Sequence, residues 1–365
     1  MASRLIARST FLIALVACNG GTAPVSGPPF GAPLVFPHEA VERATGEQWK
    51  RNDIPPRYQW NHNYGYCGEV SLISAGLYYG QYLSQYDARA AASNAPQYEY
   101  RSQLLLGVND MRAARNMHLA AVQWNDYSRD EADRFLVWVK QHVLLGQPVA
   151  IGIYINQFRF YHKRNPWAGS PQYDHIVPVV GIGTDHPGQE GAYFPDDEIT
   201  FSDNGEWGSL RHAQYFFTYR FGDFTKTRRE ANAPNGPIYS LASKAPDFGV
   251  AIAGVIDRDR ETVPVRVATN LNYELPQIAE GSSRRPQPEP LVLTVTVSAM
   301  RPGAVYNLYR YNRLDSIPDD AFNAHAASAE QKWVITAGQS GRFVMTEKIM
   351  SDEVAAYRAV PADGR

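Results

Sequence analysis

Residues 58–80 read YQWNHNYGYCGEVSLISAGLYYG and carry Cys67, one of two cysteines in this 365-residue chain. After Cys67, the apolar residues Val70, Ile73 and Leu77 recur at three- and four-residue steps, which predicts a helix with one buried face. The helix is expected to begin at or near the cysteine. Unpaired backbone N–H groups and the helix dipole stabilise an anion there, so the thiol is biased toward the nucleophilic thiolate.

A thiol nucleophile also needs an oxyanion hole and a base. Gln59 lies upstream of Cys67, and its uncharged amide could act with the backbone N–H of Cys67 as a pair of donors to an oxyanion. His175 opens the apolar, β-branched run HIVPVVGIG, which predicts a buried strand. The imidazole would then be held rigidly at the start of that strand, where it is a candidate base.

A second predicted strand, residues 198–202, is followed by Asp203 and Asn204. Side chains alternate along a strand, so Ile199, Phe201 and Asp203 share the apolar face that points into the domain. A partly desolvated carboxylate on that face would stabilise a neighbouring imidazolium, so Asp203 is the expected orienting group and Asn204 the alternative.

The order Gln, Cys, His, Asp, the Q-x7-C-G spacing, the HIVPVVG strand and the D-N-G strand end resemble a papain-like cysteine peptidase over about residues 55–215. Within that group the chain is most similar to the bacteriocin-leader (double-glycine) peptidase-like family and its secreted relatives. The resemblance implies a papain-like fold in which Cys67 is the nucleophile, His175 the base, Asp203 the orienting group and Gln59 part of the oxyanion hole. Asn204 stands where the family usually has proline, so either Asp203 or Asn204 can complete the triad.

The N-terminal residues 1–18, MASRLIARSTFLIALVAC, combine two arginines with a short apolar core, which predicts a secretory signal too short to span a membrane. Residues 15–18 resemble the lipobox of bacterial lipoproteins, which implies cleavage before Cys18 and lipidation of its thiol; an ordinary signal peptide is the alternative. Residues 19–48 are expected to form a flexible tether. We therefore expect an exported bacterial lipoprotein of the outer membrane, periplasm or cell surface.

The net charge of −2 shows no basic excess, so neither nucleic acid nor an anionic membrane surface is an expected partner. No H-E-x-x-H, paired C-x-x-C or phosphate-binding glycine loop occurs, so no metal or nucleotide cofactor is expected. Five acidic residues between Asp185 and Glu198 lack the spacing of a calcium loop and are expected in a solvated hairpin. His62, His162 and His186 are expected to be solvated loop histidines.

The predicted fold class is α+β, with a catalytic domain at residues 49–245. Ser128 and Glu131 have the spacing of a capping box before an amphipathic helix, and an apolar strand is expected at Val149–Ile155. The aromatic, turn-rich segment 156–172 is the candidate substrate-contacting loop. Seven short apolar runs after residue 246 predict a C-terminal β-sandwich of immunoglobulin or fibronectin type at 246–365, which the first domain is expected not to need for folding.

The expected activity is thiol-dependent hydrolysis of amide bonds in a peptide or peptide-like substrate. Two alternatives stay open. One is acyl transfer of transglutaminase type, because the same residues pass an acyl group to an amine or to water. The other is a non-catalytic surface binding protein that keeps the fold without turnover. The sequence does not determine the oligomeric state.

Overall fold

The computed structural model describes residues 48–60, 65–93, 103–126, 128, 131–205, 216–272 and 287–363. The signal segment with Cys18, almost all of the expected tether, and His62 lie outside these residues. None of the described helices is both long enough and apolar enough to cross a membrane.

The described chain mixes helices with mostly antiparallel strands, which confirms the predicted α+β class. The α-helices are α1 (Cys67–Tyr78), α2 (Gln85–Ala92), α3 (Asp110–Asn116), α4 (Ala132–Leu144), α5 (Gln157–Tyr161), α6 (Phe221–Phe224) and α7 (Arg228–Ala231). The first nine strands are β1 (Gln48–Arg51), β2 (Gln81–Tyr82), β3 (Leu119–Gln123), β4 (Val149–Ile155), β5 (His175–Thr184), β6 (Glu198–Ser202), β7 (Phe216–Arg220), β8 (Thr225–Lys226) and β9 (Tyr239–Ala242). The remaining strands are β10 (Gly249–Val255), β11 (Val265–Thr269), β12 (Pro290–Val297), β13 (Val305–Tyr311), β14 (Gln331–Thr336), β15 (Phe343–Met350) and β16 (Ala355–Pro361).

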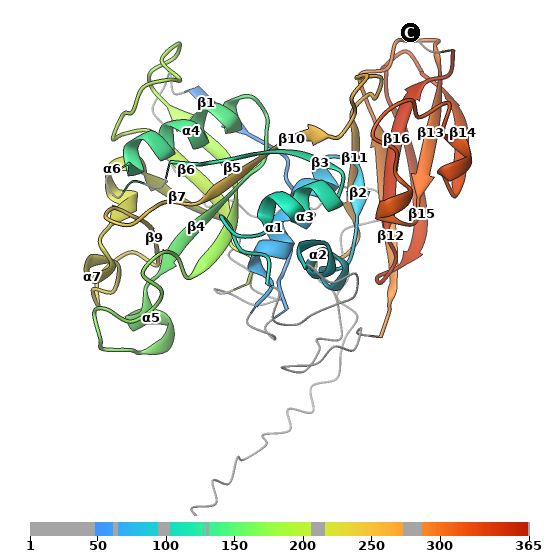
Figure 1. Cartoon of the computed structure of the whole chain (residues 1–365). Helices are drawn as coiled ribbons and strands as arrows, with labels where there is room; N and C mark the ends of the chain where they lie inside the picture. The colour runs from blue at the N-terminus through green and yellow to red at the C-terminus, as the bar shows by residue number, and fades with distance from the viewer. Residues whose placement is uncertain are drawn as a thin grey trace, which may run out of the picture.

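A nine-stranded sheet forms the body of the first part of the chain (Figure 1). Its main path runs β3-β10-β4-β5-β6-β7, while β1 pairs with β5 and β9 pairs with β4 and β8. The predicted strands at β4, β5 and β6 are confirmed and lie next to one another. The strand that begins with His175 is therefore the direct neighbour of the strand that precedes Asp203.

Helices cover both faces of this sheet, because its central strands alternate their apolar side chains between two cores. On β4, Val149 and Ile151 join the core under α4, whereas Ala150 joins the core under α1. On β5, Val177 faces α4 and Ile176 faces α1. Near-continuous apolar strands such as these are expected when both faces of a sheet are covered.

Helix α1 begins at Cys67 as predicted, but it is not amphipathic. Every residue from Gly68 to Leu77 is buried. One side of the helix packs on the sheet near Ile176, and another side packs toward β2 and β11. The expected single buried face was wrong because the sequence pattern does not show that strands from the C-terminal part cover the opposite side.

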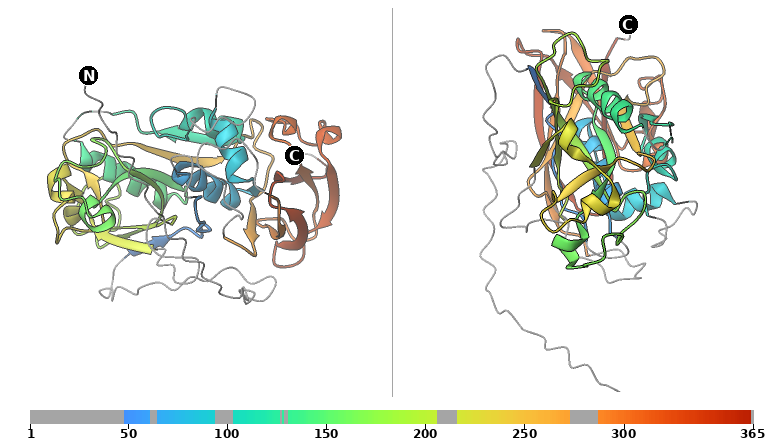
Figure 2. Two further views of the ribbon diagram at one scale, coloured as in Figure 1. Left: turned by 90° about the horizontal axis from the view of Figure 1, so that it is seen from below. Right: turned by 90° about the vertical axis from the view of Figure 1, so that its left-hand side faces the viewer.

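Two further antiparallel sheets contain the C-terminal strands, at the right of Figure 1 and also at the right of the first view in Figure 2. Each of the seven predicted runs forms a strand, β10 to β16. The sheets in which two strands were expected are different in the structure. Strand β10, expected in the sandwich, pairs instead with β3 and β4 in the nine-stranded sheet, while β2 from the first part pairs with β16 in the sheet ordered β14-β13-β16-β2.

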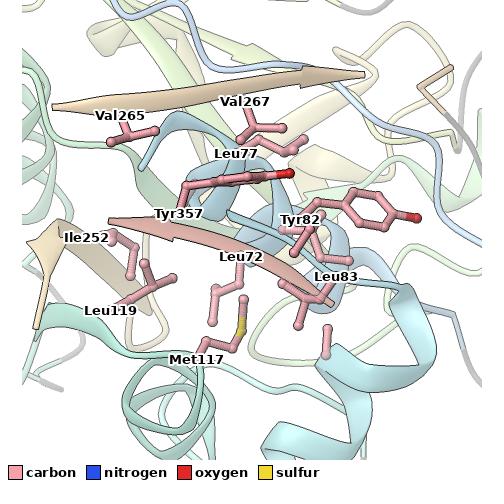
Figure 3. Packing of buried hydrophobic residues seen from close by; sticks show 14 of the residues in the cluster. Leu72, Leu77, Tyr82, Leu83, Met117, Leu119, Ile252, Val265, Val267 and Tyr357 are labelled. Atoms are coloured by element: carbon pink, nitrogen blue, oxygen red, sulfur yellow. The ribbon is translucent and has the colours of Figure 1, made fainter. Parts of the chain in front are cut away.

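One buried cluster connects the two parts of the chain. Figure 3 shows Val265 and Val267 of β11 and Tyr357 of β16 packed in the same cluster as Leu72 and Leu77 of α1. The cluster extends to Ile252 on β10 and to Tyr82 on β2 (Figure 3). The C-terminal sheets therefore cover the helix that carries the candidate nucleophile.

Candidate active site

Cys67 is the first residue of α1, and its side chain is half-buried. The residue before it, Tyr66, is fully buried and donates its backbone N–H to Oε1 of Gln59 at 2.9 Å. This hydrogen bond places the Gln59 amide beside the start of the helix, as expected for a residue that shares a site with Cys67.

Three consecutive backbone N–H groups around Gln59 each donate to a different part of the chain. The backbone N–H of Tyr58 donates to the Asn272 carbonyl at 2.7 Å, and that of Gln59 donates to the Asn204 carbonyl at 2.8 Å. The N–H of Trp60 donates to Oε1 of Gln85 on α2 at 2.8 Å. These three hydrogen bonds fix the backbone at Gln59 and at the residues before and after it.

A buried ion pair between Arg89 and Glu69, which lies two residues after Cys67, was not expected from the sequence. Nε of Arg89 lies 2.6 Å from Oε1 of Glu69, and both side chains are nearly inaccessible to solvent. The Arg89 guanidinium also donates to the Gly65 carbonyl and lies 3.6 Å from the centre of the Tyr66 ring. Arg89 thus holds the turn that leads into Cys67. The signal in the sequence was Glu69, a charge at the start of an otherwise uncharged helical run.

His175 and Asp203 lie together in the interior. Both are 1 % exposed, and Nε2 of His175 is 3.4 Å from Oδ1 of Asp203. The same carboxylate oxygen accepts a hydrogen bond from the Tyr239 hydroxyl at 2.9 Å. The Tyr239 ring stacks on the His175 ring with centroids 6.0 Å apart and planes 20° apart. Tyr239 belongs to the four-residue strand β9, which is too short to give a pattern in the sequence.

Asn204 points to a different place from Asp203, as alternation along the strand predicts. Its Nδ2 donates to the carbonyl of Cys67 at 3.1 Å and to the carbonyl of Ile176 at 2.8 Å. Because its own carbonyl accepts from the Gln59 N–H, one residue connects the oxyanion candidate, the helix start and the strand of His175. Asn204 therefore joins the parts of the site, while Asp203 contacts the histidine.

The structure brings the backbones of the candidate nucleophile and base together without a direct bond between their side chains. Among the described residues, no hydrogen bond joins the Cys67 thiol to the His175 ring. Because Nε2 of His175 faces Asp203, Nδ1 is the ring nitrogen that would have to receive the thiol proton. Catalytic hydrogen bonds are often long or misaligned before substrate binds and shorten in the complex.

Tyr173, two residues before His175, packs against the same buried cluster as Cys67. Burial is the largest cause of a raised pKa at Tyr173, and the electrostatic effect of Cys67 acts in the same direction. Its hydroxyl donates to the Leu106 carbonyl at 3.0 Å, so this side chain is neutral and fixed.

The structure also tests the expectations for His162, His186 and the acidic segment 185–198. His162 is exposed, as expected, and His186 lies 3.2 Å from the Asp196 carboxylate. The 185–198 segment is not uniformly solvated, which corrects the sequence-based expectation: Asp197 is fully buried and pairs with the equally buried Lys140 at 2.7 Å. Within the described ranges, no group of three His, Cys, Asp or Glu side chains is arranged to hold a metal ion.

Comparison with known proteins adds no assignment. A scan against protein-family models found no match, and a search of curated proteins found none either.

Proposed function

We propose that this protein hydrolyses amide bonds in a peptide or peptide-like substrate, with Cys67 as nucleophile and His175 as base. The observation that carries this proposal is the network around the helix start. Asn204 accepts the Gln59 backbone N–H and donates to the carbonyls of Cys67 and Ile176. The adjacent residue, Asp203, lies 3.4 Å from Nε2 of the buried His175. A nucleophile, a base with an orienting carboxylate, and a placed amide donor are the components of thiol-dependent acyl chemistry.

In the proposed reaction, the Cys67 sulfur attacks the carbonyl carbon of the scissile amide as its proton passes to Nδ1 of His175. Asp203 stabilises the imidazolium through Nε2, and the Tyr239 hydroxyl fixes the carboxylate for that purpose. The developing oxyanion accepts hydrogen bonds from the Gln59 amide and from the Cys67 N–H. His175 then protonates the leaving amine, and water, activated by the same imidazole, hydrolyses the thioester.

The arrangement supports a papain-like assignment for the first part. A helix begins at the cysteine, and antiparallel strands carry the histidine and the aspartate, in the order expected for that fold. We propose that the C-terminal sheets form a β-sandwich of immunoglobulin or fibronectin type, with β2 as an additional strand from the first part. An N-terminal lipid at Cys18, outside the described residues, would tether the enzyme to a membrane.

A non-catalytic binding protein is the second candidate. Such a protein would keep the same buried network and the fold without turnover. Acyl transfer uses the same groups as hydrolysis. It differs only in whether an amine or water attacks the thioester.

A peptide library separates these three functions. The Cys18→Ser protein, in which Cys67 is the only thiol, should generate new peptide N-termini at neutral pH, and the matched Cys18→Ser/Cys67→Ala protein should not. Mass spectrometry of the products with an added primary amine checks the acceptor. If most products carry the added amine, the activity is acyl transfer and not hydrolysis. If both proteins show only background cleavage, the protein is a binding protein.

A further inference from the structure

The segment 156–172, NQFRFYHKRNPWAGSPQ, has an unusual combination of charge and exposure. It contains three Arg or Lys residues and no Asp or Glu, in a chain whose net charge is −2. Trp167 is 64 % exposed and Tyr161 is 49 % exposed. Exposed tryptophan, tyrosine and arginine side chains are the residues that most often dominate the energy of a binding surface.

Buried polar side chains hold this segment in one conformation. Asn232 is buried, and its Nδ2 donates to the carbonyls of Pro166 and Ala168 at 3.0 and 2.8 Å. Its Oδ1 accepts from the Gln157 N–H at 2.9 Å and from the Arg228 guanidinium at 2.9 Å. The start of the segment and its turn at residues 166–168 are therefore connected through one asparagine.

The end of the segment is fixed next to the proposed base. Arg228 pairs with Asp174, whose carboxylate accepts the backbone N–H groups of Ser170 at 2.7 Å and Ile155 at 3.0 Å. Asp174 directly precedes His175 in the chain. The helix α5 and the loop after it lie at the end of β4 in Figure 1, so the exposed face of the segment is carried by the sheet that holds the base.

These contacts fix the backbone of the loop, while Tyr161, Trp167 and the basic side chains remain exposed. The Lys163 ammonium lies 5.4 Å from the centre of the Tyr161 ring, and the side chains of Arg159 and Arg164 are also exposed. A rigid surface loses little conformational entropy when it binds, and a patch of one charge selects a partner of the opposite charge.

We propose that the 156–172 segment is a docking surface for an acidic stretch of the polypeptide substrate, flanking the bond that is cleaved. The proposal rests on the proposed function for the identity of the substrate, but the binding itself needs no turnover. Lys163, Arg164 and Arg159 would pair with carboxylates, and Trp167 would supply the apolar contact.

Binding is measured by fluorescence polarisation on the Cys67→Ala protein, which removes turnover. The probes are short labelled peptides of alternating glutamate and alanine, or of alternating glutamine and alanine. The glutamate peptide should bind about tenfold or more tightly than the glutamine peptide, and added salt should weaken it. Lys163→Glu with Arg164→Glu should remove that preference, and Trp167→Ala should weaken binding of both peptides.

The matched control reverses the charge of two exposed lysines on the C-terminal sheets, Lys332→Glu with Lys348→Glu. It should leave the preference for the glutamate peptide unchanged. Equal binding of the two peptides, or an equal loss in both double variants, would overturn the proposal. Binding to vesicles that contain anionic lipid, without binding to the glutamate peptide, would also overturn it and assign the surface to membranes. Retained peptide preference in a protein that cleaves no peptide would instead contradict the proposed function and leave the docking surface intact.

Discussion

Replacing Cys67 or His175 with alanine is expected to lower peptide turnover by about a thousandfold or more, because the two residues act as one unit. The double variant should be no worse than either single variant. Asp203→Ala should have a smaller effect than either, since the imidazole remains and only its orientation and the stabilisation of its charged form are lost. The measurement is kcat/KM on the best peptide from the library.

Asn204→Ala is the matched control for Asp203→Ala, because the two residues are adjacent, equally buried and differ in what they contact. Loss of the Asn204 amide removes a donor to the part-buried Cys67 carbonyl and to the buried Ile176 carbonyl, so the free energy of unfolding should fall by about 1–3 kcal/mol. Its effect on kcat should be smaller than that of Asp203→Ala. A variant Asn204→Ala that melts like the wild type but turns over less than Asp203→Ala would assign the third position to Asn204.

Removing the C-terminal sheets is expected to prevent the first part from folding. A chain that ends at residue 262 loses β11 and β16, which cover Leu72 and Leu77 of α1 in the shared cluster (Figure 3). Apolar surface returned to water costs about 25 cal/mol for each Å². A domain is stable by only about 5–15 kcal/mol, so it cannot offset the exposure of a large part of its core. The truncated protein should show no cooperative thermal transition by circular dichroism.

Two point variants test the same interface without truncation. Tyr357→Ala, at a position with 0 % exposure in the shared cluster, should lower the free energy of unfolding by about 3–5 kcal/mol. Val334→Ala, on the same sheet but 68 % exposed, should change it little. A truncated chain that melts cooperatively and keeps a reactive Cys67 would show that the two parts fold independently, as the sequence suggested.

The sequence predicted the strands well because their apolar runs are uninterrupted and bounded by turn residues. It predicted β4 with its observed bounds, and it placed His175 at the start of β5 and Asp203 just after β6. It also predicted which of Asp203 and Asn204 would face the apolar side, since that depends only on the period of a strand.

What the sequence missed depends on contacts between distant segments. The expected capping box did not form, because the Ser128 hydroxyl bonds to Asp126 and α4 begins after Glu131 without a side-chain cap. Strand β10 resembles the later strands in composition, so its pairing with β3 and β4 could not be read from local pattern. Tyr239 and Arg89 reach the site from elements with no motif of their own.

The proposed reaction requires that His175 activates the Cys67 thiol. The most direct test is the rate at which iodoacetamide alkylates Cys67 between pH 5 and pH 9 in the Cys18→Ser protein, with and without His175→Ala. A free cysteine, with a pKa near 8.5, is almost entirely protonated at about pH 6 and reacts slowly there. We expect Cys67 to react at pH 6 at least about tenfold faster than free cysteine, and His175→Ala to remove that advantage. Identical pH profiles for the two proteins, both following that of free cysteine, would contradict the claim.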